Sequence, residues 1–318
     1  MNVSEIIKEL ADIIKPTDIL ICLPGLTLLG VWLLRTSLGR NALTDSRLRR
    51  NNMPGYMPLI PLFVWMGITS VAIFVKELRL PDLPQWQSAY LDNVILSAGA
   101  IAAMAVILVL ACRHFARRLK GFGLNIKTIH RDFFAAVVNL ISIYPLVFAA
   151  LIMTIFFGKL IHGGEFELQK HQELETIELY RELPVRVMVV ITAIVIVPVF
   201  EEMLFRGLFQ TTIRSFISRF LADQTSQNAG QAACPAGGEP ENPAQPGPAR
   251  AFNGAWLSIL ASSVLFAAVH ANAGHWPALF VLAVCMGYAY EKSGSLFRPI
   301  FIHSFFNAVN ITAVLYSA

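Results

Sequence analysis

Long apolar runs separated by polar loops dominate this sequence and restrict what it can fold into. They cover Ile19–Leu34, Met57–Val75, Val94–Cys112, Phe133–Phe157, Val185–Ile213, Ala255–His270, Pro277–Tyr290 and Leu296–Leu315. About 20 mostly apolar residues suffice for a helix to cross a bilayer, and in lipid the helix pairs its own backbone polar groups. The sequence therefore predicts an all-α, polytopic transmembrane bundle of about eight helices, although two of the later runs are short.

The charged residues support a membrane location and orient the chain. Only 14% of the residues are charged, whereas soluble globular proteins carry about 25%. Basic residues gather in the loops at 35–50 and 113–131, while the loop at 158–184 is acidic. This alternation follows the positive-inside rule and predicts that both termini face away from the cytoplasm. Because the Lys and Arg residues gather in these particular loops, we expect no nucleic-acid partner.

The pattern divides the chain into three parts. Residues 1–18 form an amphipathic N-terminal segment that we expect to lie on the membrane surface. Residues 19–160 hold the N-terminal transmembrane helices, and residues 161–318 hold a core that carries the chemistry. Within that core, residues 223–250 are rich in Gln, Asn, Ala, Gly and Pro and are predicted to be a disordered insertion.

Three charged residues interrupt the fifth apolar run, namely Glu201, Glu202 and Arg206. One charge at the centre of a spanning helix costs about 2.5–3.5 kcal/mol on insertion scales, so buried charges need internal partners. Glu202 and Arg206 are four residues apart and are predicted to pair on one helical face. Glu201 is rotated by about 100° from Glu202 and can point into a cavity. Pro198 can kink the helix just before them. Alternatively, these residues lie at a solvated cytoplasmic helix end.

Two later apolar runs carry histidines. His270 follows Phe266 at the end of the sixth run, and His303 and Asn307 share one helical face in the eighth. One histidine on an apolar helix is usually a core residue, but here three late runs carry ionisable or strongly polar groups and the early runs almost none. We therefore expect a common pocket in the four C-terminal helices. The other histidines lie in loops or turns and are assigned no role: His114, His130, His162, His171 and His275.

These residue types suit peptide hydrolysis. A carboxylate in an apolar pocket can act as a base near neutral pH, and a histidine can share that role or orient the water. An asparagine amide can donate to a developing oxyanion. Two histidines and a glutamate also match a zinc ligand set. A metal-bound water and a water held only by Glu and His therefore remain alternatives.

Together the three motifs resemble the CPBP family, the CAAX-protease and bacteriocin-processing group of intramembrane proteases, also labelled abortive-infection proteins. The family pattern is EExxxR, then FxxxH, then HxxxN or HxxxD. It is matched here by Glu201-Glu202…Arg206, Phe266…His270 and His303…Asn307. The resemblance covers about Val185–Leu315, while the earlier helices match only in being hydrophobic. The insertion at 223–250 departs from compact members and puts the geometry of that loop in doubt.

The resemblance implies an endopeptidase of a multi-pass protein, with the bacterial cytoplasmic membrane as the expected location and the lipid bilayer as a partner. Its substrate would be a membrane-associated peptide or protein, including prenylated CAAX-type substrates. Glu201 would activate water with His270 as its partner, and His303 and Asn307 would bind the water or the oxyanion. Glu202 and Arg206 would shape the site. The cofactor stays open: zinc or another divalent metal on His270, His303 and Glu201, or none.

Two other kinds of function fit buried Glu and His residues: a transporter with a proton relay, and a catalytically silent membrane partner. The polar groups lack a matching set in the first half of the chain, which disfavours a repeat-built transporter. The sequence contains no HExxH, GxSG or GxGD motif of other intramembrane protease classes.

One conflict concerns depth in the membrane. Strictly alternating spans would place His270 on the side opposite Glu201 and His303. Either the helix Ala255–His270 is displaced or re-entrant, or the site lies deeper than these runs suggest.

Overall fold

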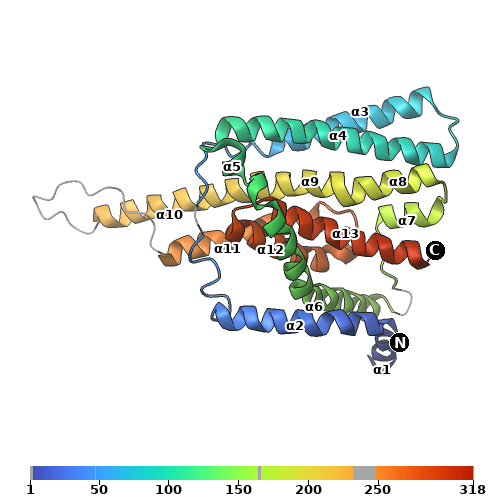
Figure 1. Cartoon of the computed structure of the whole chain (residues 1–318), viewed down its shortest axis with the longest axis horizontal. Coiled ribbons are helices and arrows are strands. Elements are labelled where there is room, and N and C mark those ends of the chain that lie inside the picture. Colours follow the sequence, from blue (N-terminus) through green and yellow to red (C-terminus); the bar gives the residue numbers. More distant parts are fainter. Residues whose placement is uncertain (1–2, 47, 164–165, 232–247, 318) are drawn as a thin grey trace, which may run out of the picture.

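The computed structural model describes residues 3–46, 48–163, 166–231 and 248–317, and these residues contain helices and no strand (Figure 1). Each predicted apolar run lies mostly within a helix. The corresponding elements are α2 (Pro16–Arg35), α3 (Leu59–Arg79), α4 (Gln85–His114), α6 (Ile129–His162), the continuous helix from α8 to α10, α11 (Pro248–Ala268), α12 (Trp276–Ser293) and α13 (Phe297–Ser317). The prediction of a polytopic helical bundle is confirmed.

The predicted count of about eight long helices agrees with the bundle, although fewer of them have the length and composition of a membrane span. Within the described chain, six helices are long and apolar enough to cross a membrane, and α11 and α12 are not among them. The apolar part of α11, Gly254–Ala268, is shorter than a span. Both termini lie at the same end of the bundle, as the charge pattern predicts (Figure 1).

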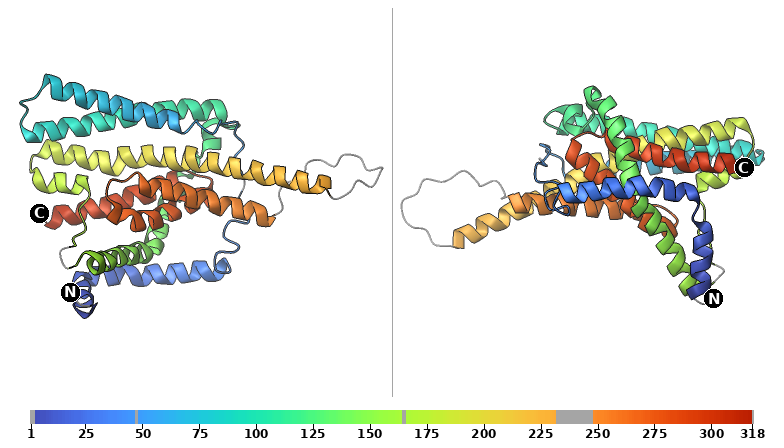
Figure 2. Two further views of the ribbon diagram at one scale, coloured as in Figure 1. Left: turned by 180° about the vertical axis from the view of Figure 1, so that it is seen from behind. Right: turned by 60° about the horizontal axis from the view of Figure 1, so that its bottom comes forward.

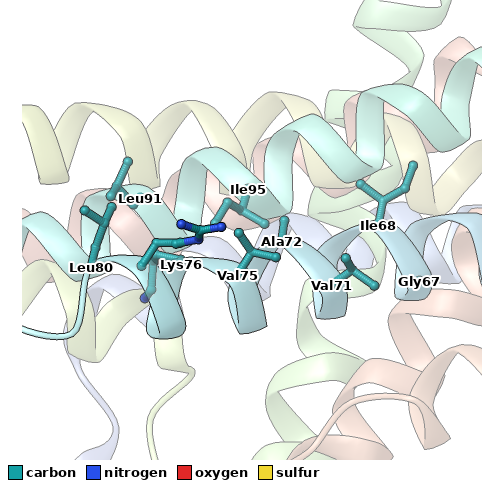
Figure 3. A pocket seen from close by; sticks show the side chains of 10 residues that line it. Gly67, Ile68, Val71, Ala72, Val75, Lys76, Leu80, Leu91 and Ile95 are labelled. Carbon is teal, nitrogen blue, oxygen red and sulfur yellow. The ribbon is translucent and has the colours of Figure 1, made fainter.

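The helices lie in three groups (Figures 1 and 2). The hairpin of α3 and α4 packs beside the long helix through α4, whereas α2 and α6 lie on the opposite side of the bundle. Helices α11, α12 and α13 lie between these groups, and α6 crosses α12 and α13. A shallow apolar groove runs between α3 and α4, where Ile68, Val71 and Val75 line it (Figure 3).

Short elements complete the chain. Helix α1 (Val3–Ile13) buries Ile6 and Leu10, and its Glu9 forms an ion pair with Lys159 of α6. The others are α5 (Arg118–Phe122), η1 (Ile126–Thr128), α7 (Gln172–Leu179) and η4 (Ala273–His275). The N-terminal segment is thus helical and amphipathic, as predicted.

The long helix contains two π-helical segments. It consists of α8 (Leu183–Ile191), η2 (Thr192–Ile196), α9 (Val197–Glu202), η3 (Met203–Gln210) and α10 (Thr211–Gln231), with η2 and η3 in π geometry. Such π segments shift backbone hydrogen bonds by one residue and are frequent at functional sites. Pro198, which has no N–H to donate, lies in the first turn of α9 directly after η2. The two glutamates end α9, between the two irregular segments.

Helical structure extends into both ends of the segment that was expected to be disordered. Helix α10 continues to Gln231, and α11 begins at Pro248. Residues 232–247 lie outside the described residues, so the expectation stays untested there.

Close packing fixes the long helix against α5. Gly207 has no side chain, and a Cβ atom at this position would collide with the ring of Phe122. Phe122 is fully buried, packs edge-on against Phe115 and accepts a 2.9 Å hydrogen bond from the Tyr290 hydroxyl through its carbonyl. The ring is therefore confined on several sides, and only glycine allows this approach.

We predict that Gly207→Ala destabilises the protein by about 1–3 kcal/mol, because added volume in a close-packed site forces neighbouring groups apart. Gly67→Ala is the matched control, since a Cβ there meets no atom within 4 Å. Unfolding of both variants in detergent micelles would measure the difference. Equal stability of the two would show that Phe122 can move aside.

Candidate active site

Four of the six predicted site residues line one cavity of about 160 Å³ inside the C-terminal half of the bundle. They are Glu201 of α9, His270 just after α11, and His303 and Asn307 of α13. Apolar side chains of α12 and α13 form part of the wall, among them Leu279, Leu282 and Phe306. The predicted convergence of three late helices is confirmed, whereas the catalytic roles of these residues stay predictions.

The remaining two site residues, Glu202 and Arg206, lie behind the cavity wall in a buried charge network. Glu202 is 0% and Arg206 1% exposed. Glu202 Oε1 accepts hydrogen bonds from Arg206 Nη1 at 2.8 Å and from His303 Nδ1 at 3.0 Å. The predicted pairing of Glu202 with Arg206 is confirmed, and the alternative of a solvated helix end is wrong.

Arg206 is held on every side. Its Nη2 donates to the Ala283 carbonyl of α12 at 3.3 Å, and its guanidinium lies 4.4 Å from the centre of the Phe266 ring. A cation over an aromatic face is stabilised by the ring quadrupole, most strongly where water is excluded. Phe266, the first residue of the FxxxH motif, thus contacts the charge network directly.

Two further residues on the same face of the long helix, Gln210 and Arg214, also contact α12. Gln210 Nε2 donates to the Gly287 carbonyl at 3.1 Å and to Glu291 Oε2 at 3.2 Å. One turn further on, Arg214 forms an ion pair with Glu291. Three polar side chains at four-residue spacing therefore bind α12 at positions that are also four residues apart.

Glu201 contrasts with its neighbour. Its side chain keeps 18% exposure, whereas that of Glu202 is fully buried. The Oε2 atoms of both glutamates have no hydrogen-bond partner among the described residues, but Glu202 Oε1 accepts two hydrogen bonds. His303 Nε2 lies 3.9 Å from Glu201 Oε2, which is too long for a hydrogen bond. Glu202 anchors one nitrogen of the His303 ring, and Glu201 faces the other. The two carboxylates thus bracket one imidazole.

His270 reaches the same cavity because α11 ends inside the bundle. Its Nδ1 donates to the Phe266 carbonyl at 2.7 Å, which leaves Nε2 as the available ring nitrogen. Its own carbonyl accepts a hydrogen bond from Trp276 Nε1 at 2.9 Å. His270 therefore lines the same cavity as Glu201 and His303, while the two alternatives for its depth in the membrane stay predictions.

Asn307 is oriented by the irregular helix opposite. Its Nδ2 donates to the Ala193 carbonyl at 2.8 Å, and Ala193 lies in the π-helical segment η2. In η2 the N–H of Val197 bonds to Thr192 rather than to Ala193. The carbonyl of Ala193 is thereby available to a side chain, and one amide proton of Asn307 remains for the cavity.

The sequence analysis missed two ionisable residues of the cavity, His171 and Glu173. His171 stacks on His275 with ring centres 4.2 Å apart, and burial followed by the neighbouring His275 and His270 rings lowers the pKa of His171 to about 4. Both missed residues come from the acidic loop before the fifth apolar run, where polarity is expected in any case. No spacing or periodicity marks them as different from their neighbours.

The predicted metal site finds no support in the donor arrangement. Among the described residues, no group of three His, Cys, Asp or Glu side chains is placed so that it could hold a metal ion. His303 uses Nδ1 on Glu202, and His270 uses Nδ1 on a carbonyl, which leaves one nitrogen each. We therefore derive no step through a metal.

We predict that Arg206→Ala costs about 3–5 kcal/mol of stability, because removing one partner leaves the buried Glu202 carboxylate with less compensation. Arg181→Ala removes the same charge from an exposed position in the loop before α8 and should change stability by less than about 0.5 kcal/mol. Unfolding in detergent would compare the two variants. A small loss at Arg206 would show that His303 alone satisfies Glu202.

Comparison with known proteins agrees with this geometry. Residues 183–309 match the family model described as type II CAAX prenyl endopeptidase Rce1-like. The match begins at α8 and ends within α13, so it includes all six motif residues. No curated protein and no solved structure matches the chain. The C-terminal part of this integral membrane protein is therefore an Rce1-like domain of the CPBP family of intramembrane proteases.

Proposed function

We propose that the protein is an intramembrane endopeptidase in which Glu201 and His303 activate a water molecule without a metal. The observation that supports this most directly is one cavity that is lined by Glu201, His270, His303 and Asn307. These residues come from three segments that are distant in sequence, namely α9, the end of α11 and α13. Polar groups in a bilayer protein are expensive unless they serve one another or a function. Within the described chain, no charged side chain lies within hydrogen-bond distance of Glu201, and its Oε2 atom accepts no hydrogen bond.

The tautomer of His303 follows from its contact with Glu202. A carboxylate can only accept, so His303 Nδ1 carries the proton and, in the neutral ring, Nε2 is an acceptor. Glu201 Oε2 and His303 Nε2 are then two acceptors 3.9 Å apart. A water that donates one proton to each is held with its oxygen lone pair directed into the cavity. This arrangement orients a nucleophile.

The reaction that follows is general-base hydrolysis. The water oxygen bonds to the carbonyl carbon of the substrate, and its proton passes to Glu201. The remaining amide proton of Asn307 stabilises the oxyanion. When the C–N bond breaks, the leaving nitrogen takes a proton returned from Glu201, with His270 Nε2 as the neighbouring carrier. The products are a carboxylic acid, which keeps the second proton of the water, and an amine, so all atoms balance.

The substrate is proposed to be a membrane-associated peptide or protein, and prenylated CAAX-type chains are included because the matched family is described by them. The apolar wall of Leu279, Leu282 and Phe306 suits an uncharged stretch of such a chain. We place the protein in a bacterial cytoplasmic membrane.

We predict that Glu201→Gln and His270→Ala each lower cleavage of a membrane-tethered peptide at least about 100-fold, the usual contribution of general acid–base catalysis. Glu175→Gln, on the exposed face of α7, is the control and should cleave normally. Reconstituted vesicles with a fluorescent farnesylated peptide supply the assay.

Thermal unfolding would show that the inactive variants remain folded. Undiminished cleavage in both variants would reject Glu201 and His270 as the catalytic groups, whereas no cleavage by the wild-type protein would favour a silent partner or a transporter.

A further inference from the structure

A capping segment, residues 166–179, closes one side of the candidate active site. The Gln169 carbonyl accepts hydrogen bonds from Asn272 Nδ2 at 3.2 Å and from His275 Nε2 at 2.7 Å. Both donors lie in the turn that follows His270. The His171 ring stacks on the His275 ring and meets the His270 ring edge-on with centres 6.5 Å apart. The capping segment is thus fixed to the element that carries a site residue.

Helix α7 within this segment has a defined orientation. Ile177 is fully buried in a cluster with Val185 and Val189 of α8, and α7 also contacts α13. Figure 1 shows α7 beside both of these helices. Glu173 lies one turn before Ile177, so the two share the inner face of α7. Burial of Ile177 therefore directs Glu173, together with Leu174, to the cavity, which both residues line.

The charges that line the cavity have one sign. Its lining contains the carboxylates of Glu201 and Glu173 and, among the described residues, no lysine or arginine. Glu173 forms no hydrogen bond or ion pair within the described chain, whereas Glu178 on the same helix binds Lys170 at 2.7 Å. The nearby Arg206 is paired with Glu202 behind the wall. Glu173 is therefore a half-buried carboxylate without a Lys or Arg partner in the described chain, and the other titratable groups that line its cavity are Glu201 and the imidazoles of His171, His270 and His303.

We infer that Glu173 selects substrates that carry a positively charged side chain close to the scissile bond. This inference rests on the proposed function and adds a substrate class to it. In a partly enclosed cavity, two carboxylates attract a Lys or Arg side chain and repel an acidic one, so one contact supplies both attraction and discrimination. Glu201 is needed for the chemistry, which leaves Glu173 as the carboxylate that can stay paired with the substrate throughout the reaction.

The test uses the full-length protein in vesicles and farnesylated, fluorescein-labelled decapeptides. The peptides are identical except for one Lys, norleucine or Glu that is moved through the positions on both sides of the cleaved bond. We expect wild type to prefer Lys over norleucine at one position by about fivefold in kcat/KM, the factor expected of a half-buried ion pair. Glu173→Gln should abolish this preference, and Glu173→Lys should reverse it in favour of Glu.

The control is Glu175→Gln, which removes the same charge from the exposed side of α7 and should retain the wild-type preference. Binding of the same peptides to Glu201→Gln, measured by fluorescence anisotropy, tests the selection without any turnover. A Lys preference that is absent, or equal in wild type and Glu173→Gln, in both cleavage and binding would overturn the inference. If the wild-type protein cleaves none of the peptides while the preference for Lys in binding remains, the result would count against the proposed hydrolysis and not against the role of Glu173.

Discussion

The need to pair buried charges governs the C-terminal half of this protein. Glu202 lies in a fully buried position, and its carboxylate is stabilised only because Arg206 and His303 donate to it. Breaking such a pair is far more costly than breaking one in water. The contact fixes the rotation of α9 relative to α13, and that rotation in turn directs Glu201 into the cavity. The placement of Glu201, the glutamate proposed to be catalytic, thus depends on the structural role of Glu202.

The sequence predicted the convergence of the motifs but not how His270 joins them. Residues with ionisable or strongly polar side chains stand out in lipophilic runs, so Glu201, Glu202, His270, His303 and Asn307 could be selected, and helical geometry indicated the pairing of Glu202 with Arg206. Alternating spans placed His270 on the side opposite Glu201, because hydropathy does not show where along the bundle a helix ends. The π-helical segments depend on tertiary contacts such as that of Asn307 with Ala193. Glu173 could not be predicted as a site residue, because it is one of several glutamates in a polar loop and no sequence pattern distinguishes it from the others.

The site also bears on the alternatives to proteolysis. A proton relay requires a chain of ionisable groups that leads from one side of the membrane to the other. Here the ionisable groups that line the cavity are gathered at one enclosed place, and Arg206 and Glu202 behind it are tied to each other. This arrangement suits a reaction with one bound water better than transfer across the bilayer. A silent partner would have the same geometry, so turnover decides that point.

The contacts of Arg206, Gln210 and Arg214 with α12 have a mechanical consequence. Because both sets of positions repeat every four residues, a small axial displacement of α12 would separate all three side chains from their acceptors at the same time. Equivalent contacts recur only after a whole helical turn, a step of about 5.4 Å. These contacts therefore resist sliding of helix α12 along its axis. Leu279 and Leu282 of α12 are held at a constant height beside Glu201. In the proposed reaction, this wall would set the depth at which a bound chain meets the nucleophile.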